Sequence, residues 1–199
     1  LCYLYFREPS VPEVTVERDL YGPTRRFLSM RFGGLLARRA GSGSPRLFCN
    51  EVAEVPGETG GRWTRPDVAA LAISRGEFVP YWRADLHTFE IKTAGGLDVT
   101  GAHEARAQGR FGHFAWLVFQ TVGRAAPETN RYREVVDSAA GLGVGVLVCV
   151  NPDEPDDWHI VEWPERSPAG AQELRQVGPT VTGHGGSSSA SRGWRACDC

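Results

Sequence analysis

The sequence contains almost no lysine. Lys92 is the only lysine among its 22 basic residues, and all the others are arginines. Surface charge is therefore supplied by guanidinium groups, which stay protonated, whereas an ammonium is a compact donor whose pKa its neighbours can tune. We interpret Lys92 as a residue that is required for chemistry rather than for solubility.

Other absences narrow the class of protein. The net charge of -2 and the pI of about 6.2 argue against a general basic nucleic-acid binder. They do not argue against a nuclease, because an acidic cluster and a local arginine patch can cancel in the total. The phosphate-binding pattern GxxxxGK(S/T) and the Rossmann glycine fingerprint are absent, and no helix-turn-helix or zinc module is visible. An enzyme of another α/β class is therefore the weaker alternative.

Cysteine usage and hydrophobicity indicate the compartment. The five cysteines form no Cys-x-x-Cys pair, and Cys49 and Cys149 fall in apolar runs, where buried free thiols are common. We recognise no signal-peptide pattern and no apolar run of membrane-spanning length in these residues. We therefore expect a protein of the reducing cytoplasm with no membrane partner.

The composition predicts one folded domain. The chain has 199 residues, 41% of them hydrophobic, which is enough to bury a sizeable core. We expect a strand-like extension over residues 1–14, a domain over residues 15–163, and a polar, disordered tail over residues 164–199.

Hydrophobic periodicity predicts an alternation of helices and strands. Helices are expected over residues 15–36, 99–112 and 129–140. Strands are expected over residues 46–55, 65–73, 84–93, 114–120, 143–150 and 158–163. A Gly/Ser loop spans residues 40–45, and a connection containing Arg75, Tyr81 and Trp82 joins the second and third strands. A three-stranded meander followed by βαβ crossovers implies a mixed sheet flanked by helices, which is an α/β fold.

Three charged residues fall on two of these strands. Glu90 and Lys92 are two positions apart, so their side chains share one face, and Ile91 between them points into the core. Asp67, after Pro66, stands at the head of the preceding strand. Two carboxylates and an ammonium at a strand edge can hold a divalent metal ion and a water beside a phosphate.

Pro66-Asp67 followed by Glu90-Ile91-Lys92 resembles the PD-(D/E)xK nucleases, which have the restriction-endonuclease-like fold. The resemblance covers residues 15–163, with most weight on residues 65–113. It implies a mixed β-sheet core with the element order αβββαβ, flanked by helices. It also implies Mg²⁺ or Mn²⁺ bound by the Asp67 and Glu90 carboxylates and the Ile91 carbonyl, with Lys92 orienting or helping to deprotonate the attacking water.

The resemblance also suggests auxiliary residues. Members often add an acid from the first helix, which here would be Glu17, or Asp19 as the weaker choice. Glu51 or Glu54 on the first strand is the rival, and a second metal ion would need one of these acids. Gln108 matches a helix position that orients phosphate or active-site groups.

Contacts to nucleic acid are expected from arginines near the motif, namely Arg65, Arg106 and Arg110. Three tryptophans could stack on bases, although packing in the core or at its rim is the commoner role: Trp63, Trp82 and Trp116. His103 and His113 flank the predicted helix, and we expect structural or solvated roles for both.

The sequence therefore predicts a metal-dependent nuclease that hydrolyses phosphodiester bonds by attack of an activated water, and the resemblance implies a 5′-phosphate product. Nucleic acid is the expected partner, with DNA favoured. The alternative is a catalytically inactive nuclease-like module that binds nucleic acid or serves in assembly. Because the near-neutral charge suggests modest affinity, a homodimer or a partner subunit is expected to supply specificity.

Overall fold

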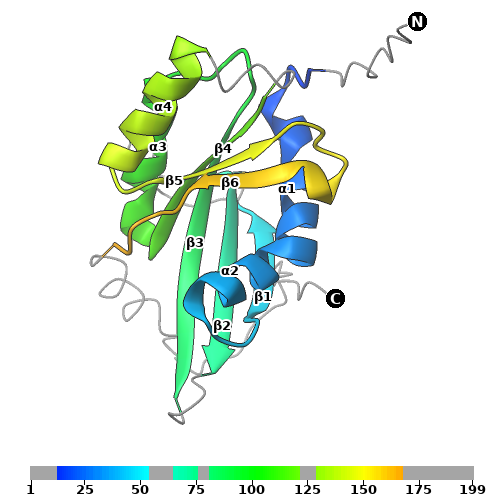
Figure 1. The fold of residues 1–199 in the computed structure, drawn as a ribbon, viewed down its shortest axis with the longest axis vertical. Coiled ribbons are helices and arrows are strands. Elements are labelled where there is room, and N and C mark those ends of the chain that lie inside the picture. Colours follow the sequence, from blue (N-terminus) through cyan, green and yellow to red (C-terminus); the bar gives the residue numbers. More distant parts are fainter. Residues whose placement is uncertain (1–12, 54–64, 76–80, 122–128, 168–199) are drawn as a thin grey trace, which may run out of the picture.

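The computed structural model describes residues 13–53, 65–75, 81–121 and 129–167 (Figure 1). Within them lies one six-stranded mixed sheet whose strands follow chain order from edge to edge. The strands are β1 (Arg46–Glu51), β2 (Val68–Arg75), β3 (Trp82–Lys92), β4 (Phe114–Gln120), β5 (Gly145–Cys149) and β6 (Trp158–Glu162). The pairs β3–β4 and β4–β5 are parallel and the others antiparallel. The predicted α/β class with a mixed sheet is confirmed.

Helical segments connect and cover these strands. The N-terminal helical run, residues 17–40, joins a 3-10 turn η1 (Glu17–Leu20), helix α1 (Tyr21–Phe27), a π-helical turn η2 (Leu28–Phe32) and helix α2 (Gly33–Ala40). Helix α3 (Val99–Gln108) continues into the 3-10 turn η3 (Gly109–Phe111). Helix α4 (Asn130–Gly141) and the 3-10 turn η5 (Pro155–Asp157) complete the described helices.

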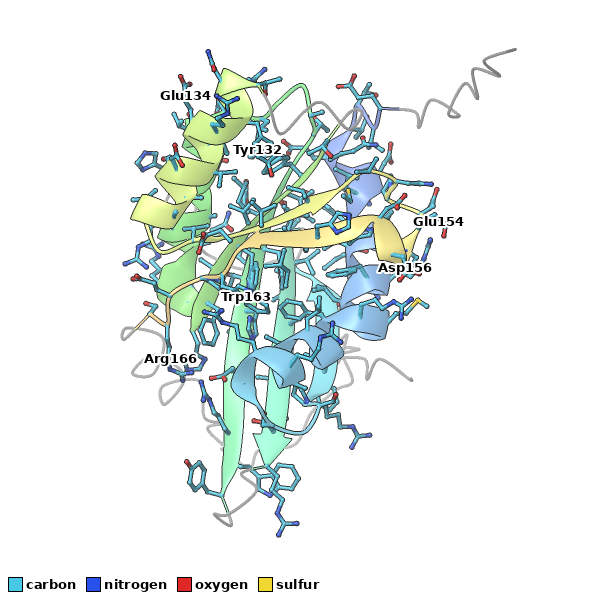
Figure 2. The ribbon with its side chains drawn as sticks, viewed as in Figure 1. Tyr132, Glu134, Glu154, Asp156, Trp163 and Arg166 are labelled. Atoms are coloured by element: carbon cyan, nitrogen blue, oxygen red, sulfur yellow. The ribbon has the colours of Figure 1, made fainter. Side chains whose placement is uncertain are left out.

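The helices lie on the two faces of the sheet. The N-terminal helical run packs Leu20, Phe27 and Phe32 against one face. Helices α3 and α4 pack on the other face, where Tyr132 turns inward and Glu134 turns to solvent (Figure 2). The residues of β5 are all buried, as expected for an interior strand covered on both faces. Two hydrophobic cores therefore share one sheet.

Side-chain alternation along β3 divides the two cores. Phe89 and Ile91 belong to the core under the N-terminal helical run, whereas Glu90 and Lys92, one position out of phase, share the opposite face. In β4, Trp116 likewise faces the N-terminal helical run, and Leu117 faces α3 and α4. The predicted burial of Ile91 is confirmed, with an exposed fraction of 0%.

The N-terminal helical run differs from the prediction at its end. It continues to Ala40, four residues past the predicted end at Leu36, because alanine and arginine are good helix formers even where the apolar stripe has stopped. It ends at Gly41, whose φ of 61° is the left-handed conformation that favours glycine.

The β2–β3 hairpin is longer than predicted at its outer end. Arg75 and Trp82, which we expected in a connection, pair with each other across the strands. Trp82 is 69% exposed, so this part of the hairpin lacks the apolar alternation that predicts a strand. At the inner end β2 begins at Val68, so the predicted start at Arg65 was wrong.

Other boundaries shift where close packing or glycine intervenes. Helix α3 ends at Gln108 instead of residue 112, because a Cβ at Gly109 would lie 2.9 Å from the Ala115 Cβ, and the chain tightens into a 3-10 turn to enter β4. Strand β1 ends at Glu51 and β5 covers only Gly145–Cys149. Both strands are therefore shorter than the predicted ranges 46–55 and 143–150.

The ordered structure continues past residue 163. The backbone N–H of Glu165 donates to the Gly143 carbonyl at 3.0 Å, and that of Ser167 donates to the His113 carbonyl at 2.8 Å. Residues 164–167 therefore belong to the folded unit, although we expected the tail to begin there. The rest of the predicted tail, and residues 1–12 of the predicted extension, lie outside the described residues.

Two smaller findings bear on the predictions. Cys49 and Cys149 are buried free thiols, as predicted, and burial raises the pKa of Cys149 to about 12. Of the helices in the described ranges, none combines the length and apolar character needed to cross a membrane.

His87 lies in an aromatic cluster of the first core. Its ring stacks on Phe114 with centroids 4.8 Å apart, and its Nδ1 accepts a hydrogen bond from Trp116 Nε1 at 3.1 Å. Burial lowers the pKa of His87 to about 3. The folded protein therefore holds this histidine neutral, and protonation favours the unfolded chain.

The His87→Phe variant should show a weaker loss of stability in acid than the wild type. Between pH 7.5 and 5 the unfolded chain binds a proton at His87 and the folded protein does not, which removes about 2 kcal/mol of stability. Urea unfolding at both pH values measures the difference, with His159→Phe, at an exposed position of β6, as the control. An unchanged pH dependence in His87→Phe would contradict the assignment of a neutral buried histidine.

Candidate active site at the Asp67, Glu90 and Lys92 cluster

Asp67 lies directly before β2 and is held by five hydrogen bonds, the longest of them from the Ala53 N–H to its carbonyl at 3.4 Å. Its backbone N–H donates to the Phe89 carbonyl at 3.1 Å, and its carbonyl accepts from the Val52 N–H at 2.9 Å. Its side-chain Oδ2 accepts from the Ile91 N–H at 2.8 Å and Oδ1 accepts from the Tyr21 hydroxyl at 2.5 Å. The carboxylate is therefore positioned by β3 and by α1.

Glu90 and Lys92 project together from the end of β3. The Lys92 ammonium lies 2.7 Å from Glu90 Oε1 and 2.7 Å from Glu104 Oε2. Glu17 Oε1 is 3.6 Å from the same nitrogen. The Lys92 and Glu90 side chains are 16% and 8% exposed, so these ion pairs are largely removed from solvent. The single lysine of the chain is surrounded by three carboxylates.

Helix α3 supplies the partners on the other side of the cluster. Glu104 and Gln108 are four residues apart and so lie on one face of the helix. Gln108 Nε2 donates a hydrogen bond to Glu90 Oε2. The helix approaches closely because residue 101 is glycine, where a Cβ would stand 3.3 Å from Lys92 Cγ. Asp98 caps the helix by accepting from the Thr100 N–H at 2.8 Å.

Burial and charge shift the pKa values in this cluster. Burial raises the pKa of Glu90 to about 7, with the nearby Asp67 carboxylate adding to the rise against the opposing effects of Lys92 and Gln108. Burial likewise raises the pKa of Asp67, although the hydrogen bonds from Tyr21 and Ile91 oppose it. Two acids are therefore held where their charged forms are penalised.

The pKa of Lys92 moves in the direction opposite to its burial. Burial alone lowers it, but the hydrogen bonds to Glu104 and Glu90 and the attraction of these carboxylates outweigh that effect and raise it. The pKa of Tyr21 is raised by burial and by its hydrogen bond to Asp67. Near neutral pH, Lys92 is therefore a cation and Tyr21 a neutral hydroxyl donor.

The donor chemistry fits a hard divalent cation. Asp67 and Glu90 supply carboxylate oxygens, and their raised pKa values mean that an added positive charge would stabilise their ionised forms. The Ile91 N–H points to Asp67, and the carbonyl of a strand residue projects to the same side as its N–H. In the described part of the chain no group of three or more His, Cys, Asp or Glu side chains is arranged to hold a metal ion, so an ion at this site would have two carboxylates and one backbone carbonyl as its protein donors.

The candidate auxiliary acids differ in whether they lie near Lys92. Glu17 lies at the cluster, where burial raises its pKa, Lys92 lowers it and Asp67 raises it further. Glu51 instead pairs with Arg25 at 2.9 Å, and Asp19 is exposed. Glu54 lies outside the described residues. Among the described candidates, proximity to Lys92 favours Glu17.

The other residues predicted for the site take no part in the hydrogen bonds and ion pairs of Asp67, Glu90 and Lys92 described above. Arg106 and Arg110 are exposed, with Arg110 over the Phe111 ring at 4.5 Å, and Arg65 donates to the Ala53 carbonyl at 3.3 Å. His103 is exposed, and His113 accepts from the Leu86 N–H at 2.9 Å, so His113 has the structural role that was expected. Trp116 is a core residue and Trp63 is not described.

Two residues of the cluster, Tyr21 and Glu104, were not predicted from the sequence. Tyr21 comes from a helix 46 residues before its partner Asp67, and nothing in its local pattern distinguishes it from a core tyrosine. Glu104 falls in the helix predicted over residues 99–112, and no role was predicted for it. Its spacing of four residues from Gln108 was the available signal, since that spacing puts both side chains on one helix face.

Comparisons with known proteins add no relative. No family model matches the chain, and neither a curated protein nor a solved structure matches it.

The Glu90→Gln variant should be more stable than the wild type at alkaline pH. Because the folded pKa of about 7 exceeds the ordinary 4.5, the stability that Glu90 contributes is present below pH 4.5 and is lost as the pH rises through 7. We expect the variant to gain on the order of 1–3 kcal/mol at pH 8 and almost nothing at pH 4.5.

Urea unfolding at the two pH values measures this difference, and Glu134→Gln on the exposed face of α4 is the matched control. Equal changes in the free energy of unfolding for the two substitutions at pH 8 would mean that burial does not penalise the ionised form of Glu90.

Proposed function

We propose that the protein is a metal-dependent nuclease of the PD-(D/E)xK type that hydrolyses phosphodiester bonds of nucleic acid, with DNA as the expected substrate. The observation that supports this most directly is the convergence of Asp67, Glu90 and Lys92. They come from two segments of the chain, and the Ile91 N–H to Asp67 Oδ2 hydrogen bond of 2.8 Å joins those segments. Two acids and one ammonium at the end of adjacent strands are the groups that this chemistry needs.

The order of the elements also supports the proposal. The N-terminal helical run, the β1–β2–β3 meander, α3 and β4 follow one another as helix, three strands, helix and strand. This is the αβββαβ order expected of the restriction-endonuclease-like fold. Asp67 lies directly before β2, and Glu90 and Lys92 lie at the end of β3, which brings the motif residues to neighbouring strands and supports the proposal.

Each residue of the cluster has its own task in this proposal. Asp67 and Glu90 would hold Mg²⁺ or Mn²⁺, with the Ile91 carbonyl as a third donor. The ion would lower the pKa of a water and neutralise charge on the scissile phosphate. The Tyr21 hydroxyl fixes the orientation of Asp67, and the Gln108 amide fixes that of Glu90.

Lys92 acts as a donor rather than as a base. Its raised pKa keeps the ammonium protonated near neutral pH, so it can orient the attacking water and stabilise negative charge that develops on the phosphate. Of the two roles considered for this lysine, electrostatic stabilisation is therefore favoured over proton abstraction. Glu104 and Glu17 hold the ammonium in place.

The nuclease proposal predicts cleavage that depends on both metal and Lys92. Labelled single-stranded DNA, double-stranded DNA and RNA are incubated with Mg²⁺, Mn²⁺ or EDTA. The wild type should cut at least one substrate with metal and none with EDTA. Lys92→Ala and Asp67→Asn should each lose about 100-fold or more, as expected when a group that stabilises the transition state is removed.

The matched controls are Arg38→Ala and Asp137→Asn, which change exposed residues away from the cluster and should cut like the wild type. Cutting that survives Lys92→Ala would place the active site elsewhere. A folded wild type that binds nucleic acid without cutting any substrate would favour the inactive nuclease-like module.

The Tyr21→Phe variant tests the positioning of Asp67. Loss of a hydrogen bond to a charged group costs about 1.5–3 kcal/mol, so kcat should fall roughly 10- to 100-fold while KM for the nucleic acid changes little. The control is Tyr132→Phe, since Tyr132 packs on Phe119 under α4, away from Asp67. A Tyr21→Phe enzyme with unchanged kcat would show that Asp67 does not need this hydroxyl.

A further inference from the structure

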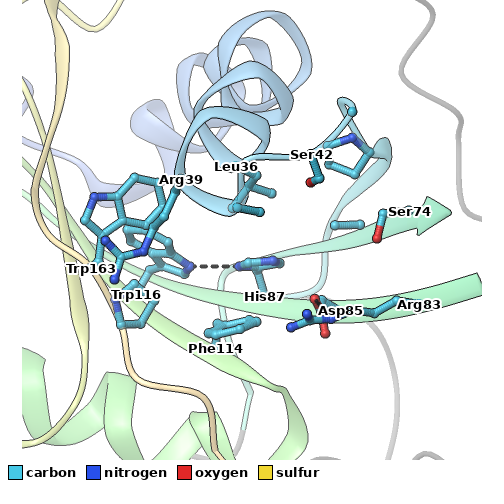
Figure 3. Close-up of a pocket in the computed structure, with 15 residues that line it drawn as sticks. Leu36, Arg39, Ser42, Ser74, Arg83, Asp85, His87, Phe114, Trp116 and Trp163 are labelled. Atoms are coloured by element: carbon cyan, nitrogen blue, oxygen red, sulfur yellow. Dashed lines mark hydrogen bonds and ion pairs between the residues drawn. The ribbon is translucent and has the colours of Figure 1, made fainter. Parts of the chain in front are cut away.

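A separate hollow lies on the face of the sheet that the N-terminal helical run covers (Figure 3). Its volume is about 340 Å³, within the range of small-molecule sites. Residues of α2 and the loop after it, of β2, β3 and β4, and of the segment after β6 line it. His87 of β3 lines the hollow, whereas Glu90 and Lys92 face the other side of the sheet. The hollow is therefore distinct from the candidate active site.

Aromatic side chains form much of its wall. Trp116 and Trp163 meet edge to face with centroids 5.7 Å apart, and Phe114 stacks on His87 at 4.8 Å. Figure 3 shows Trp116 and Phe114 beside His87 on the wall of the hollow. Trp116 is fully buried, whereas Phe114 and Trp163 are half-buried, so the open parts of Phe114 and Trp163 favour a flat, apolar ring system as the occupant.

His87 supplies a hydrogen-bond donor inside the hollow. Its Nδ1 accepts from Trp116 Nε1, and burial keeps the imidazole neutral by lowering its pKa to about 3. The proton of the neutral ring is therefore on Nε2. No hydrogen-bond partner for Nε2 is found among the residues that the structure describes, so this N–H can donate to an acceptor on a ligand.

The rim of the hollow carries an excess of positive charge. Asp85 accepts from Arg83 Nε at 2.7 Å and also pairs with Arg166, so two guanidinium groups share one carboxylate. Arg39 adds a third cation, with its guanidinium 4.7 Å from the centre of the Trp163 ring. Arginine beside an aromatic wall binds a phosphate bidentately and stacks on a ring.

We propose that this hollow binds a nucleoside monophosphate. Phe114 and Trp163 hold the base, the His87 N–H donates to a ring acceptor, and Arg39 with Arg83 attracts the phosphate. The hydroxyls of Ser42 and Ser74 lie on the lining as partners for the sugar. The inference does not rest on nuclease activity, because none of these residues belongs to the Asp67, Glu90 and Lys92 cluster.

Calorimetric titration of the full chain tests the proposal. AMP, GMP, CMP and UMP are titrated in EDTA, and adenosine and inorganic phosphate serve as the fragments of AMP. At least one monophosphate should bind, with both fragments at least tenfold weaker, since stacking and charge each contribute about 1–3 kcal/mol. The proposal is overturned if no monophosphate binds at millimolar concentration, or if phosphate or adenosine alone binds as tightly as AMP.

Paired variants locate the binding. Arg39→Gln changes an exposed side chain and should weaken binding about tenfold, whereas Arg38→Gln, the neighbouring exposed arginine outside the lining, should not. Trp163→Leu should weaken it similarly, with the exposed Trp82→Leu as its control. Arg39→Gln with unchanged affinity would overturn the assignment, whatever Trp163→Leu does to folding.

The Lys92→Ala variant separates this site from the candidate active site, where a nuclease could hold a nucleotide product. Unchanged affinity in Lys92→Ala supports the hollow as the binding site. A matching loss in that variant would place the nucleotide at the Asp67, Glu90 and Lys92 cluster instead. Binding with no cleavage of nucleic acid would leave this inference standing while the nuclease proposal failed.

Discussion

The hydrogen bonds of Asp67 are the interaction on which the rest of the site depends. Its backbone groups tie the chain to Val52 and Phe89 on either side. Its carboxylate joins the Ile91 N–H to the Tyr21 hydroxyl. One residue therefore links the start of β2, the end of β3 and helix α1. Because the same residue bears the carboxylate of the motif, the geometry of the sheet and the geometry of the site are set together.

Burying so many acids near one another is costly, and the only lysine offsets part of that cost. The raised pKa values of Glu90 and Asp67 indicate that the fold would be more stable with neutral groups in their places. Lys92 is held by Glu90 and Glu104 at 2.7 Å each. Acids that carry this electrostatic cost mark the cluster as a candidate functional site rather than a source of stability.

Strand β3 separates two environments by alternation alone. Glu90 and Lys92 face α3, where charged partners surround them, while His87, Phe89 and Ile91 face the N-terminal helical run and its aromatic core. A shift of one residue in register would exchange the two sets. The antiparallel pairing with β2, which runs from Arg75–Trp82 to Val68–Phe89, prevents that shift and keeps the acidic cluster and the hollow on opposite faces.

The sequence by itself determined the mixed α/β fold, the burial of Ile91 and the shared face of Glu90 and Lys92, because these follow from periodicities of two and 3.6 residues. Tertiary structure decided which side chains meet the motif. Tyr21 reaches Asp67 across 46 residues, Glu17 rather than Glu51 approaches Lys92, and Glu104 completes the cluster. Those contacts depend on where α1 and α3 dock on the sheet, and no local pattern encodes a docking position.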